Sequence, residues 1–303
     1  MSTIAVLQMT SGVDPAGNAD TLIAGMAQAR EGGADMLFAP EMALLLDRDR
    51  KHAGETMAAD GYPALVDRLR NAAREHSIWA TFGLPVRLEG GMLANRSLLI
   101  APTGEIAGRY DKLHMFDVDL DSGESWRESN AYKAGGGAVS VPDTPLGRLG
   151  LTICYDIRFP ALFDALGRER CDVIAIPAAF TVPTGKAHWH VLQRARAIEA
   201  SAFVIAAAQV GKHEDGRRTY GHSLVVDPWG EVLADGGFDT GFVSAEIDPA
   251  QVDDLLSLLP SDDPVSWVRR DDGLVGWGRA AELRTAGASR FDDAAAWWSE
   301  LTS

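Results

Sequence analysis

Short apolar runs alternate with segments whose apolar residues recur every three or four positions, and this alternation predicts strands separated by helices. The predicted strands cover residues 4–9, 36–39, 79–86, 150–154, 172–177 and 203–210. Two predicted helices each have one apolar face, formed by Leu22, Ile23, Met26 and Ala29 and by Val66, Leu69 and Ala73. A third helix is predicted over residues 187–200. This order indicates an α/β protein.

The second half of the chain repeats the order of the first. Residues 172–177 resemble 36–39, and residues 150–154 take the place of the opening strand. Two hairpins are the clearest repeat, because residues 97–107 and 223–233 agree at five of eleven positions around a Pro-x-Gly turn.

Two similar β/α halves predict two mixed sheets. Each apolar sheet needs both faces covered, so we expect a four-layer α-β-β-α sandwich. A doubly wound dinucleotide-binding fold is the alternative, but the Gly135-Gly136-Gly137 run lacks the GxGxxG spacing of that fold. We interpret the three glycines as a flexible loop.

The character of the sequence changes after Pro260. We therefore assign residues 1–260 to one domain and residues 261–303 to a carboxyl-terminal extension rich in Asp, Arg, Gly and Trp. A short amphipathic helix is predicted over residues 291–301, with Trp297 and Trp298 on its apolar side. This extension either covers the domain or meets a second subunit.

The composition limits the class of partner. The chain has 28 basic and 43 acidic side chains, and its net charge of -15 repels phosphate backbones and anionic membranes, so neither nucleic acid nor a membrane is expected as a partner. Cys154 and Cys171 are its two cysteines, which fits a reducing compartment. The amino terminus lacks a signal-peptide pattern. We expect a soluble, cytoplasmic protein.

Residues 150–160, Gly-Leu-Thr-Ile-Cys-Tyr-Asp-Ile-Arg-Phe-Pro, carry the strongest chemical signal. An apolar strand runs into Cys154 and Pro160 opens a helix, so the thiol is expected at the carboxyl end of a strand, where α/β sheets usually bind ligands. A free cysteine is more often a small core residue. The polar residues that follow it favour a nucleophile, whereas Cys171 has an apolar setting and is interpreted as structural.

Attack on an amide by a thiol also needs a base, a cation or N–H donors for the oxyanion, and an acid for the leaving group. Glu41 follows the strand 36–39 at a position where the second half has Ala178, and this asymmetry favours a functional role over a solvated loop residue. Lys112, taken alone, is a surface charge, although its segment mixes apolar and ionisable residues. Glu128 is either a loop charge or a second carboxylate.

Rival chemistries have weaker support. His188 and His190 are two positions apart, which on a helix places them on different sides, so they suit a metal only on a strand. Residues 221–225 lack the final glycine of a serine nucleophile elbow. A cysteine–histidine pair would need His188, His190 or His222 beside Cys154, and no local signature supports it.

At these residues the sequence resembles the nitrilase, or carbon-nitrogen hydrolase, superfamily. The similarity runs from Ile4 to about Pro260 in ordered motifs at residues 38–41 (Phe-Ala-Pro-Glu), 110–117 (Tyr-Asp-Lys-Leu-His-Met-Phe-Asp), 128–130 (Glu-Ser-Asn) and 153–160 (Ile-Cys-Tyr-Asp-Ile-Arg-Phe-Pro). The resemblance implies a four-layer sandwich and a triad of Glu41, Lys112 and Cys154. It implies an auxiliary role for Glu128, and neither a metal nor an organic cofactor.

Three later motifs, residues 187–199, 206–211 and 220–230, resemble the Nit amidases, in particular the type that hydrolyses deaminated glutathione. The ω-amidases, which act on α-ketoglutaramate, are the alternative. The expected reaction is hydrolysis of a linear, carboxylated amide to acid and ammonia through a cysteine thioester. A non-catalytic interaction protein on the same fold is the other class of function, and the complete triad disfavours it.

The resemblance also implies substrate contacts. Backbone N–H groups near Tyr155 are expected to help Lys112 hold the oxyanion. Arg158 is the candidate guanidinium for the substrate carboxylate, since arginine binds carboxylates in a bidentate way. Phe180 and Thr184 are expected to line the pocket from the loop after the strand 172–177. We expect a homodimer or a higher homo-oligomer.

Overall fold

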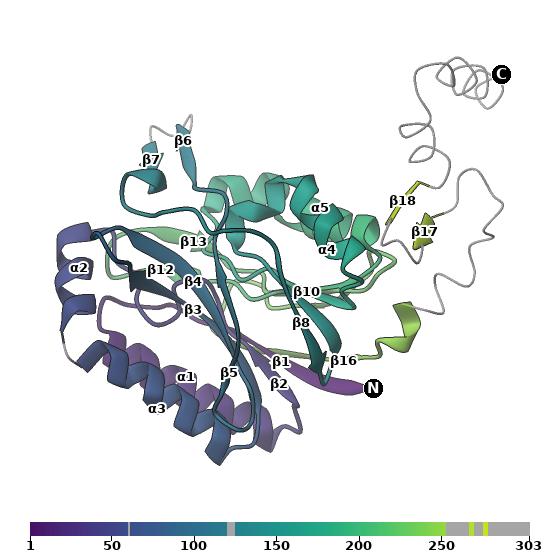
Figure 1. Cartoon of the computed structure of the whole chain (residues 1–303), viewed down its shortest axis with the longest axis horizontal. Coiled ribbons are helices and arrows are strands. Elements are labelled where there is room, and N and C mark those ends of the chain that lie inside the picture. The colour runs from purple at the N-terminus through teal and green to yellow at the C-terminus, as the bar shows by residue number, and fades with distance from the viewer. Residues whose placement is uncertain (60, 120–124, 253–266, 270–274, 278–303) are drawn as a thin grey trace.

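The first of two facing sheets is built mainly from the first half of the chain. The computed structural model describes residues 1–59, 61–119, 125–252, 267–269 and 275–277 (Figure 1). The strand order of this sheet is β16-β1-β2-β3-β4-β5, in which β1, β2 and β3 are parallel and the others antiparallel to their neighbours. The strands are β1 (Ser2–Gln8), β2 (Met36–Phe38), β3 (Trp79–Arg87), β4 (Leu93–Ile100), β5 (Ile106–Asp111) and β16 (Gly241–Ile247).

The second sheet repeats this plan with the order β15-β14-β11-β10-β9-β8. Again three central strands, β9, β10 and β11, are parallel, with an antiparallel hairpin on one side and a single antiparallel strand on the other. The strands are β8 (Val139–Thr144), β9 (Gly147–Leu151), β10 (Val173–Ala175), β11 (Phe203–Ala206), β14 (Leu224–Val226) and β15 (Val232–Asp235). The predicted repeat is therefore present in the topology.

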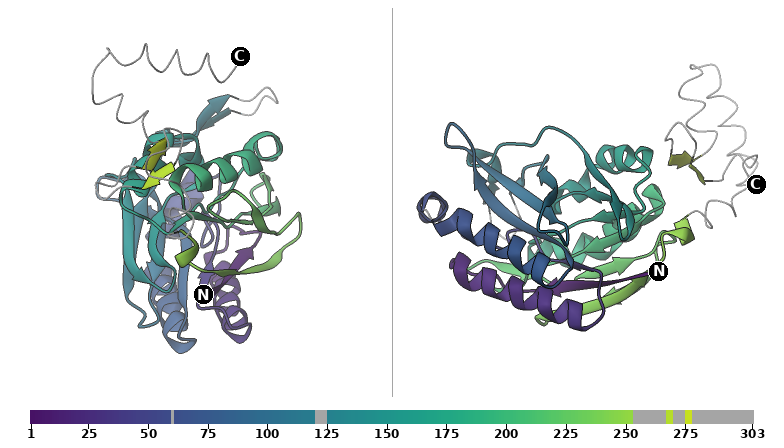
Figure 2. Two further views of the ribbon diagram at one scale, coloured as in Figure 1. Left: turned by 90° about the vertical axis from the view of Figure 1, so that its right-hand side faces the viewer. Right: turned by 60° about the horizontal axis from the view of Figure 1, so that its bottom comes forward.

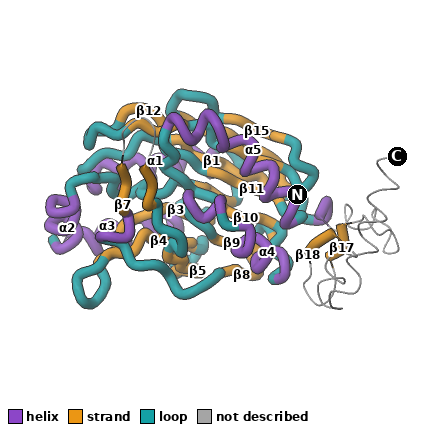
Figure 3. Tube along the Cα trace, turned by 90° about the horizontal axis from the view of Figure 1, so that it is seen from above, coloured by secondary structure: helices purple, strands orange, loops and turns teal. Residues whose placement is uncertain are grey.

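Helices cover the outer faces of both sheets. Helices α1 and α3 lie on the first sheet, and α4 and α5 lie on the opposite side of the molecule, over the second sheet (Figures 2 and 3). Three of the helices carry a proline in their first turn, where its missing N–H costs nothing. The helices are α1 (Pro15–Glu31), α2 (Arg50–Ala58), α3 (Gly61–Glu75), α4 (Pro160–Arg168) and α5 (Val182–Ala200). The predicted four-layer sandwich is confirmed.

The alternation of side chains along β1 shows how the layers form. Ile4 and Val6 pack in the same apolar cluster as residues of the second sheet, such as Leu149. Ala5 and Leu7 pack with the apolar face of α1. Since successive strand residues point to opposite faces, one apolar strand supplies both the layer between the sheets and the layer under the helices.

Several elements differ from the sequence-based expectations. Helix α5 begins at Val182 rather than near residue 187, because Pro183 is tolerated in a first helical turn. Thr184 therefore lies in that turn and not in a loop. The expected strand 203–210 divides into β11 and β12 (Val210–Lys212), and the latter pairs with β13 (Arg218–Tyr220).

The described residues between β5 and β8 include short regular elements. They contain a hairpin of β6 (Asp117–Asp119) and β7 (Ser125–Arg127) and a 3-10 turn, η1 (Glu128–Asn130). Gly135 is not a freely moving residue, because a Cβ there would lie 2.1 Å from the carbonyl oxygen of Asp111. Its N–H donates to the carbonyl oxygen of Lys112 at 3.0 Å. The glycine is needed for this close approach.

The proposed division at residue 260 stays a prediction. Beyond residue 252 the structure describes only an antiparallel pair, β17 (Trp267–Arg269) with β18 (Val275–Trp277). The helix predicted over 291–301 lies outside the described residues. Within the described ranges, no helix combines the length and the apolar character needed to cross a membrane.

We predict that Gly83→Ala destabilises the fold beneath Glu41. A Cβ at Gly83 would lie 2.6 Å from the backbone nitrogen of Met42 and 2.7 Å from Cα of Glu41. Overpacking of this kind typically costs about 1–3 kcal/mol, which urea unfolding measures. Gly54→Ala is the matched control, because Gly54 lies inside α2 and a Cβ added there would have no neighbour within 4 Å, so the free energy of unfolding is expected to stay unchanged or rise slightly. Equal stability of both variants would contradict the prediction.

Candidate active site

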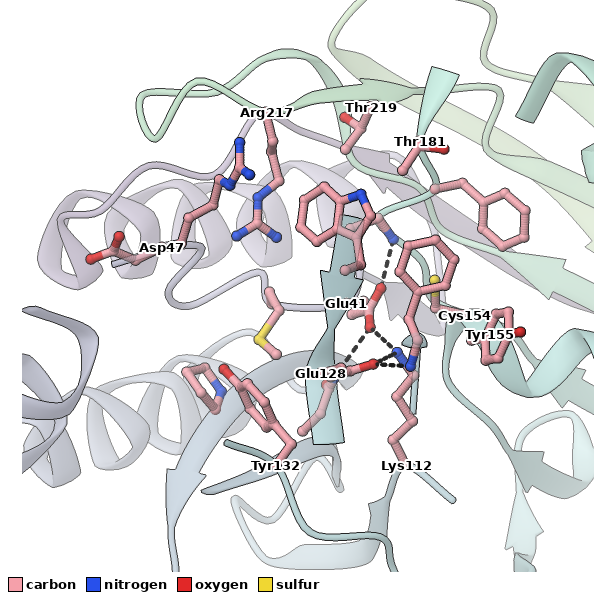
Figure 4. Close-up of a pocket in the computed structure, with 18 of the residues that line it drawn as sticks. Glu41, Asp47, Lys112, Glu128, Tyr132, Cys154, Tyr155, Thr181, Arg217 and Thr219 are labelled. Atoms are coloured by element: carbon pink, nitrogen blue, oxygen red, sulfur yellow. Dashed lines mark hydrogen bonds and ion pairs between the residues drawn. The ribbon is translucent and has the colours of Figure 1, made fainter. Parts of the chain in front are cut away.

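Four residues from distant parts of the chain meet in one pocket. Glu41 lies in the turn after β2, Lys112 directly follows β5, Glu128 opens η1, and Cys154 opens a second 3-10 turn, η2 (Cys154–Arg158). Figure 4 shows the charged ends of Glu41, Lys112 and Glu128 pointing toward one another beside Cys154. The structure thus brings together the three expected triad members and the expected second carboxylate.

Cys154 sits on a tight turn three residues beyond the end of β9, and not on the last strand residue as expected. Its φ of 50° is in the left-handed region, which costs energy for a residue other than glycine. The Cys154 N–H donates to the carbonyl oxygen of Pro177 at 2.9 Å. This backbone geometry presents the thiol at the pocket, while Asp156 and Ile157 of η2 are buried in the protein.

Asp156 stabilises this turn through hydrogen bonds and is fully buried. Its carboxylate accepts hydrogen bonds from the Ile153 N–H at 2.9 Å, from the Tyr110 hydroxyl at 2.6 Å and from the His114 N–H at 3.0 Å. Asp156 therefore has a structural role, because it ties η2 to the segment that carries Lys112.

The Glu41 carboxylate is buried and has several hydrogen-bond donors. Oε1 accepts from Asn95 Nδ2 at 2.7 Å and from Lys112 Nζ at 3.1 Å, and Oε2 accepts from the Ala179 N–H at 2.7 Å. The Cys154 thiol is a further neighbour, and its interaction with the carboxylate also favours the charged form of Glu41. Burial alone would raise the pKa of Glu41, but the Lys112 charge and these hydrogen bonds outweigh it, so its pKa lies below the usual value.

The ammonium of Lys112 lies between two carboxylates. Its side chain is 2% exposed, and Nζ lies 2.8 Å from Glu128 Oε2 and 3.1 Å from Glu41 Oε1. Burial disfavours the charge, yet the two carboxylates outweigh this effect and raise the pKa of Lys112 well above its usual value. Lys112 therefore remains a cation at neutral pH.

The Cys154 thiol, in contrast to Lys112, is held in its uncharged form. Burial raises the pKa of Cys154 well above its usual value, and the neighbouring Glu41 carboxylate raises it further, while Lys112 lowers it only in part. The resting pocket therefore holds a neutral thiol, a carboxylate and an ammonium. A carboxylate beside a thiol can accept its proton during attack, which is general-base catalysis.

Asn95, on β4, is a site residue that the sequence did not indicate. Its Nδ2 bridges Glu41 Oε1 and Glu128 Oε1, at 2.7 and 3.1 Å, and its buried Oδ1 has no hydrogen-bond partner. An asparagine inside an apolar strand is a weak signal, because many strand ends carry polar residues. Glu128 also accepts from the Phe116 N–H at 2.7 Å, which fixes its position.

The pocket has a volume of about 260 Å³ and a mixed lining. Besides the four central residues, its walls carry aromatic side chains and guanidinium groups. Among the expected substrate contacts, Tyr155, Phe180 and Thr184 all line it. The other aromatic and basic lining residues are Phe116, Trp126, Tyr132, Arg48, Arg50, Arg127, Arg217 and Arg218.

Arg158 is not among the lining residues. Its guanidinium carbon lies 5.8 Å from the ring centre of Tyr155 and 5.7 Å from that of Phe180, and Nη2 lies 3.2 Å from Nδ1 of His188. The side chain thus packs against two rings that do line the pocket. Its expected role as the carboxylate anchor stays a prediction.

The described histidines lie outside the pocket lining, so the arrangement gives no support to a cysteine–histidine pair. His190, His222 and Asp235 place potential ligand atoms within 4.8 Å of one another. Hydrogen bonds from both rings to the Asp235 carboxylate, at 3.1 and 2.8 Å, already account for this cluster.

Known proteins share this sequence and this fold. The chain is 37% identical over 263 residues to deaminated glutathione amidase of Yersinia enterocolitica, covering 86% of this chain and 91% of that protein. The enzyme of the same name from Synechocystis is 39% identical over 259 residues, covering 85% and 95%.

A solved structure and a family model agree with these relatives. The structure of the Caenorhabditis elegans NitFhit protein superimposes with a TM-score of 0.79 at 39% identity, covering 86% of this chain and 63% of that longer one. The model of the carbon-nitrogen hydrolase family matches residues 3–255. The resemblance seen in the sequence is confirmed: the chain belongs to the carbon-nitrogen hydrolase family and is an enzyme that hydrolyses carbon–nitrogen bonds.

Proposed function

We propose that this enzyme hydrolyses a linear amide through a thioester on Cys154, and that deaminated glutathione is its preferred substrate. The observation that carries the mechanism is the meeting of the Cys154 thiol, the Glu41 carboxylate and the Lys112 ammonium in one buried pocket. The names of its relatives support the substrate.

In the first half of the reaction Glu41 accepts the thiol proton as the sulfur attacks the amide carbon. The carbonyl oxygen becomes negative and is stabilised by the Lys112 ammonium and by the N–H of Tyr155. That N–H lies in the first turn of η2, where backbone donors have no acceptor within the helix. The C–N bond then breaks, Glu41 returns the proton to the leaving nitrogen, and the acyl group remains on sulfur.

In the second half a water molecule replaces the departed amine. Glu41 removes a proton from this water as it attacks the thioester carbon, and the proton then returns to the sulfur, so the acid leaves and the thiol is restored. Glu128 acts through Lys112. By holding Nζ at 2.8 Å, it keeps the ammonium charged and in place during both halves.

The nature of the leaving group follows from the chemistry of this substrate. Deaminated glutathione carries a keto oxygen in place of the glutamyl amino group, and its scissile nitrogen belongs to cysteinylglycine. Hydrolysis therefore releases 2-oxoglutarate and an amine. The ammonia expected from the sequence applies only to primary amides such as α-ketoglutaramate.

A cytoplasmic location and a homo-oligomer are part of the proposal. The scarcity of cysteine supports the first. Exposed apolar side chains on α5 and on the β14–β15 hairpin, Val191 at 68% and Trp229 at 69%, support the second. Sedimentation equilibrium is expected to give a mass of at least two chains, and a monomer at micromolar concentration would exclude this part.

Replacing the nucleophile is expected to abolish turnover. Cys154→Ala should lower the release of 2-oxoglutarate from deaminated glutathione by about 10⁴-fold or more, because no other group in the pocket can form the thioester. Cys171→Ala is the control, since Cys171 is the other cysteine of the chain and does not line the pocket. Unfolding curves check that both variants fold. Turnover by Cys154→Ala close to the wild-type rate would refute the mechanism.

The same assay separates the two substrates. A higher kcat/KM for deaminated glutathione than for α-ketoglutaramate is expected from the wild-type enzyme. The reverse order would instead favour an ω-amidase.

The pH profile is expected to be flat across neutrality. The pKa of Glu41 lies below 4.5 and that of Lys112 above 10.5, so both groups are ionised in between. Activity falls in acid as Glu41 gains a proton and in alkali as Lys112 loses one. We expect kcat/KM to be constant from about pH 5.5 to about pH 8.5. An acid limb near pH 6.5, typical of histidine, would indicate a different base.

A further inference from the structure

The mouth of the pocket is basic although the protein is strongly acidic. The net charge is -15, yet five arginines line this one pocket, and the acidic residues among its described lining are Glu41, Asp47 and Glu128. Two of these carboxylates are engaged with Lys112. Two of the five arginines pair with carboxylates outside the lining, Arg127 with Asp119 and Arg217 with Asp215. An acidic chain that gathers guanidinium groups at one opening concentrates a positive potential there, which attracts anions.

Two of these arginines lie against one aromatic ring. The guanidinium carbon of Arg48 is 4.9 Å from the ring centre of Trp126, and that of Arg217 is 5.7 Å away. Trp126 stands in the middle of β7, and its Nε1 is buried without a hydrogen-bond partner. A buried indole N–H without an acceptor is costly, and an acceptor on a ligand in this pocket would offset that cost.

The charges of the two arginines differ in how they are balanced. Nε and Nη2 of Arg217 both lie 2.8 Å from Asp215 Oδ2, and this nearly buried carboxylate fixes the direction of the guanidinium. Arg48 has no acidic partner within the part of the chain that the structure describes. Arg48 therefore adds an uncompensated positive charge at the opening.

The position of this group relative to the triad indicates which part of a substrate it meets. Figure 4 shows Arg217 on the opposite side of the pocket from Lys112, with Glu41 and Cys154 between them. Arg48 is exposed, so this side is open to solvent. The leaving amine must depart to solvent before water can enter, whereas the acyl group stays on the sulfur. We assign the leaving half of the substrate to this open side, toward Arg48 and Arg217, because it is the half that must depart first.

We propose that Arg48, Arg217 and the indole N–H of Trp126 form an anion subsite that binds a carboxylate on the leaving half of the substrate. The enzyme then selects amides whose amine product ends in a carboxylate, such as a short peptide. This inference rests on the proposed amidase function and adds the group that recognises the leaving half. A guanidinium and an indole N–H only donate hydrogen bonds and an ionised carboxylate only accepts them, so the groups are complementary.

The test compares two substrates that differ only in this carboxylate. One is deaminated glutathione, and the other is the same molecule with its glycine carboxylate capped as a carboxamide. The acyl group and the scissile bond are identical, so a difference in kcat/KM reports on the far end alone. The wild-type enzyme is expected to prefer the free carboxylate by about 10-fold to 100-fold, as is typical of hydrogen bonds to a charged group.

Three variants locate the source of this preference. Arg48→Ala removes a charge that has no described acidic partner, and Trp126→Phe removes the indole N–H while keeping an aromatic ring. Each is expected to bring the ratio of the two kcat/KM values closer to one. Arg217→Ala should do the same, although it leaves Asp215 without its partner. Arg68→Ala is the control, because Arg68 pairs with Asp20 away from the pocket and makes the same change in net charge.

The outcomes separate the subsite from the proposed function. A wild-type ratio near one, or a ratio unchanged in both Arg48→Ala and Trp126→Phe, overturns the subsite even if the enzyme is an efficient amidase. If neither substrate is hydrolysed, the proposed substrate fails, and calorimetric titration of Cys154→Ala with cysteinylglycine and cysteinylglycinamide decides the subsite. The subsite is supported if cysteinylglycine binds more tightly than cysteinylglycinamide and this difference disappears when Arg48→Ala is added. Equal binding of the two ligands to Cys154→Ala overturns the subsite.

Discussion

The buried ammonium of Lys112 is the interaction on which the site depends. A lysine charge in a protein interior is costly unless opposite charges surround it, and here Glu41 and Glu128 lie within 3.1 Å of Nζ. Asn95 links the two carboxylates, and backbone N–H groups fill their remaining positions. Meeting this one requirement locks together the turn after β2, the end of β5 and η1.

The same environment assigns the protonation state of each group. Burial holds the proton on the thiol of Cys154. The Lys112 charge and the hydrogen bonds that Glu41 accepts keep Glu41 ionised. The two neighbouring groups thus have pKa values displaced in opposite directions, which is what the proposed nucleophile and the proposed base require. The strained backbone at Cys154 is held by the buried Asp156, so the fold supports the geometry that the chemistry requires.

The sequence by itself determined the α/β class, the internal repeat and the family. Apolar runs and Pro-Gly turns are local signals, because a strand must be apolar to be buried between layers and a hairpin needs turn residues. Glu41, Lys112 and Cys154 were also predictable, since each follows a strand and lies within a family motif. Local signals failed where a neighbour in space decides the outcome, as for Gly135, whose role depends on the carbonyl oxygen of Asp111.

Only the tertiary structure decided what surrounds the triad. Asn95 and the Ala179 N–H reach Glu41 from β4 and from the second sheet, and a backbone N–H has no signature in a sequence. The grouping of Arg48 and Arg217 around Trp126 joins residues far apart along the chain. Net charge could not reveal it, because a sum over all side chains does not show where opposite charges are separated, and only the folded chain places these cations at one opening.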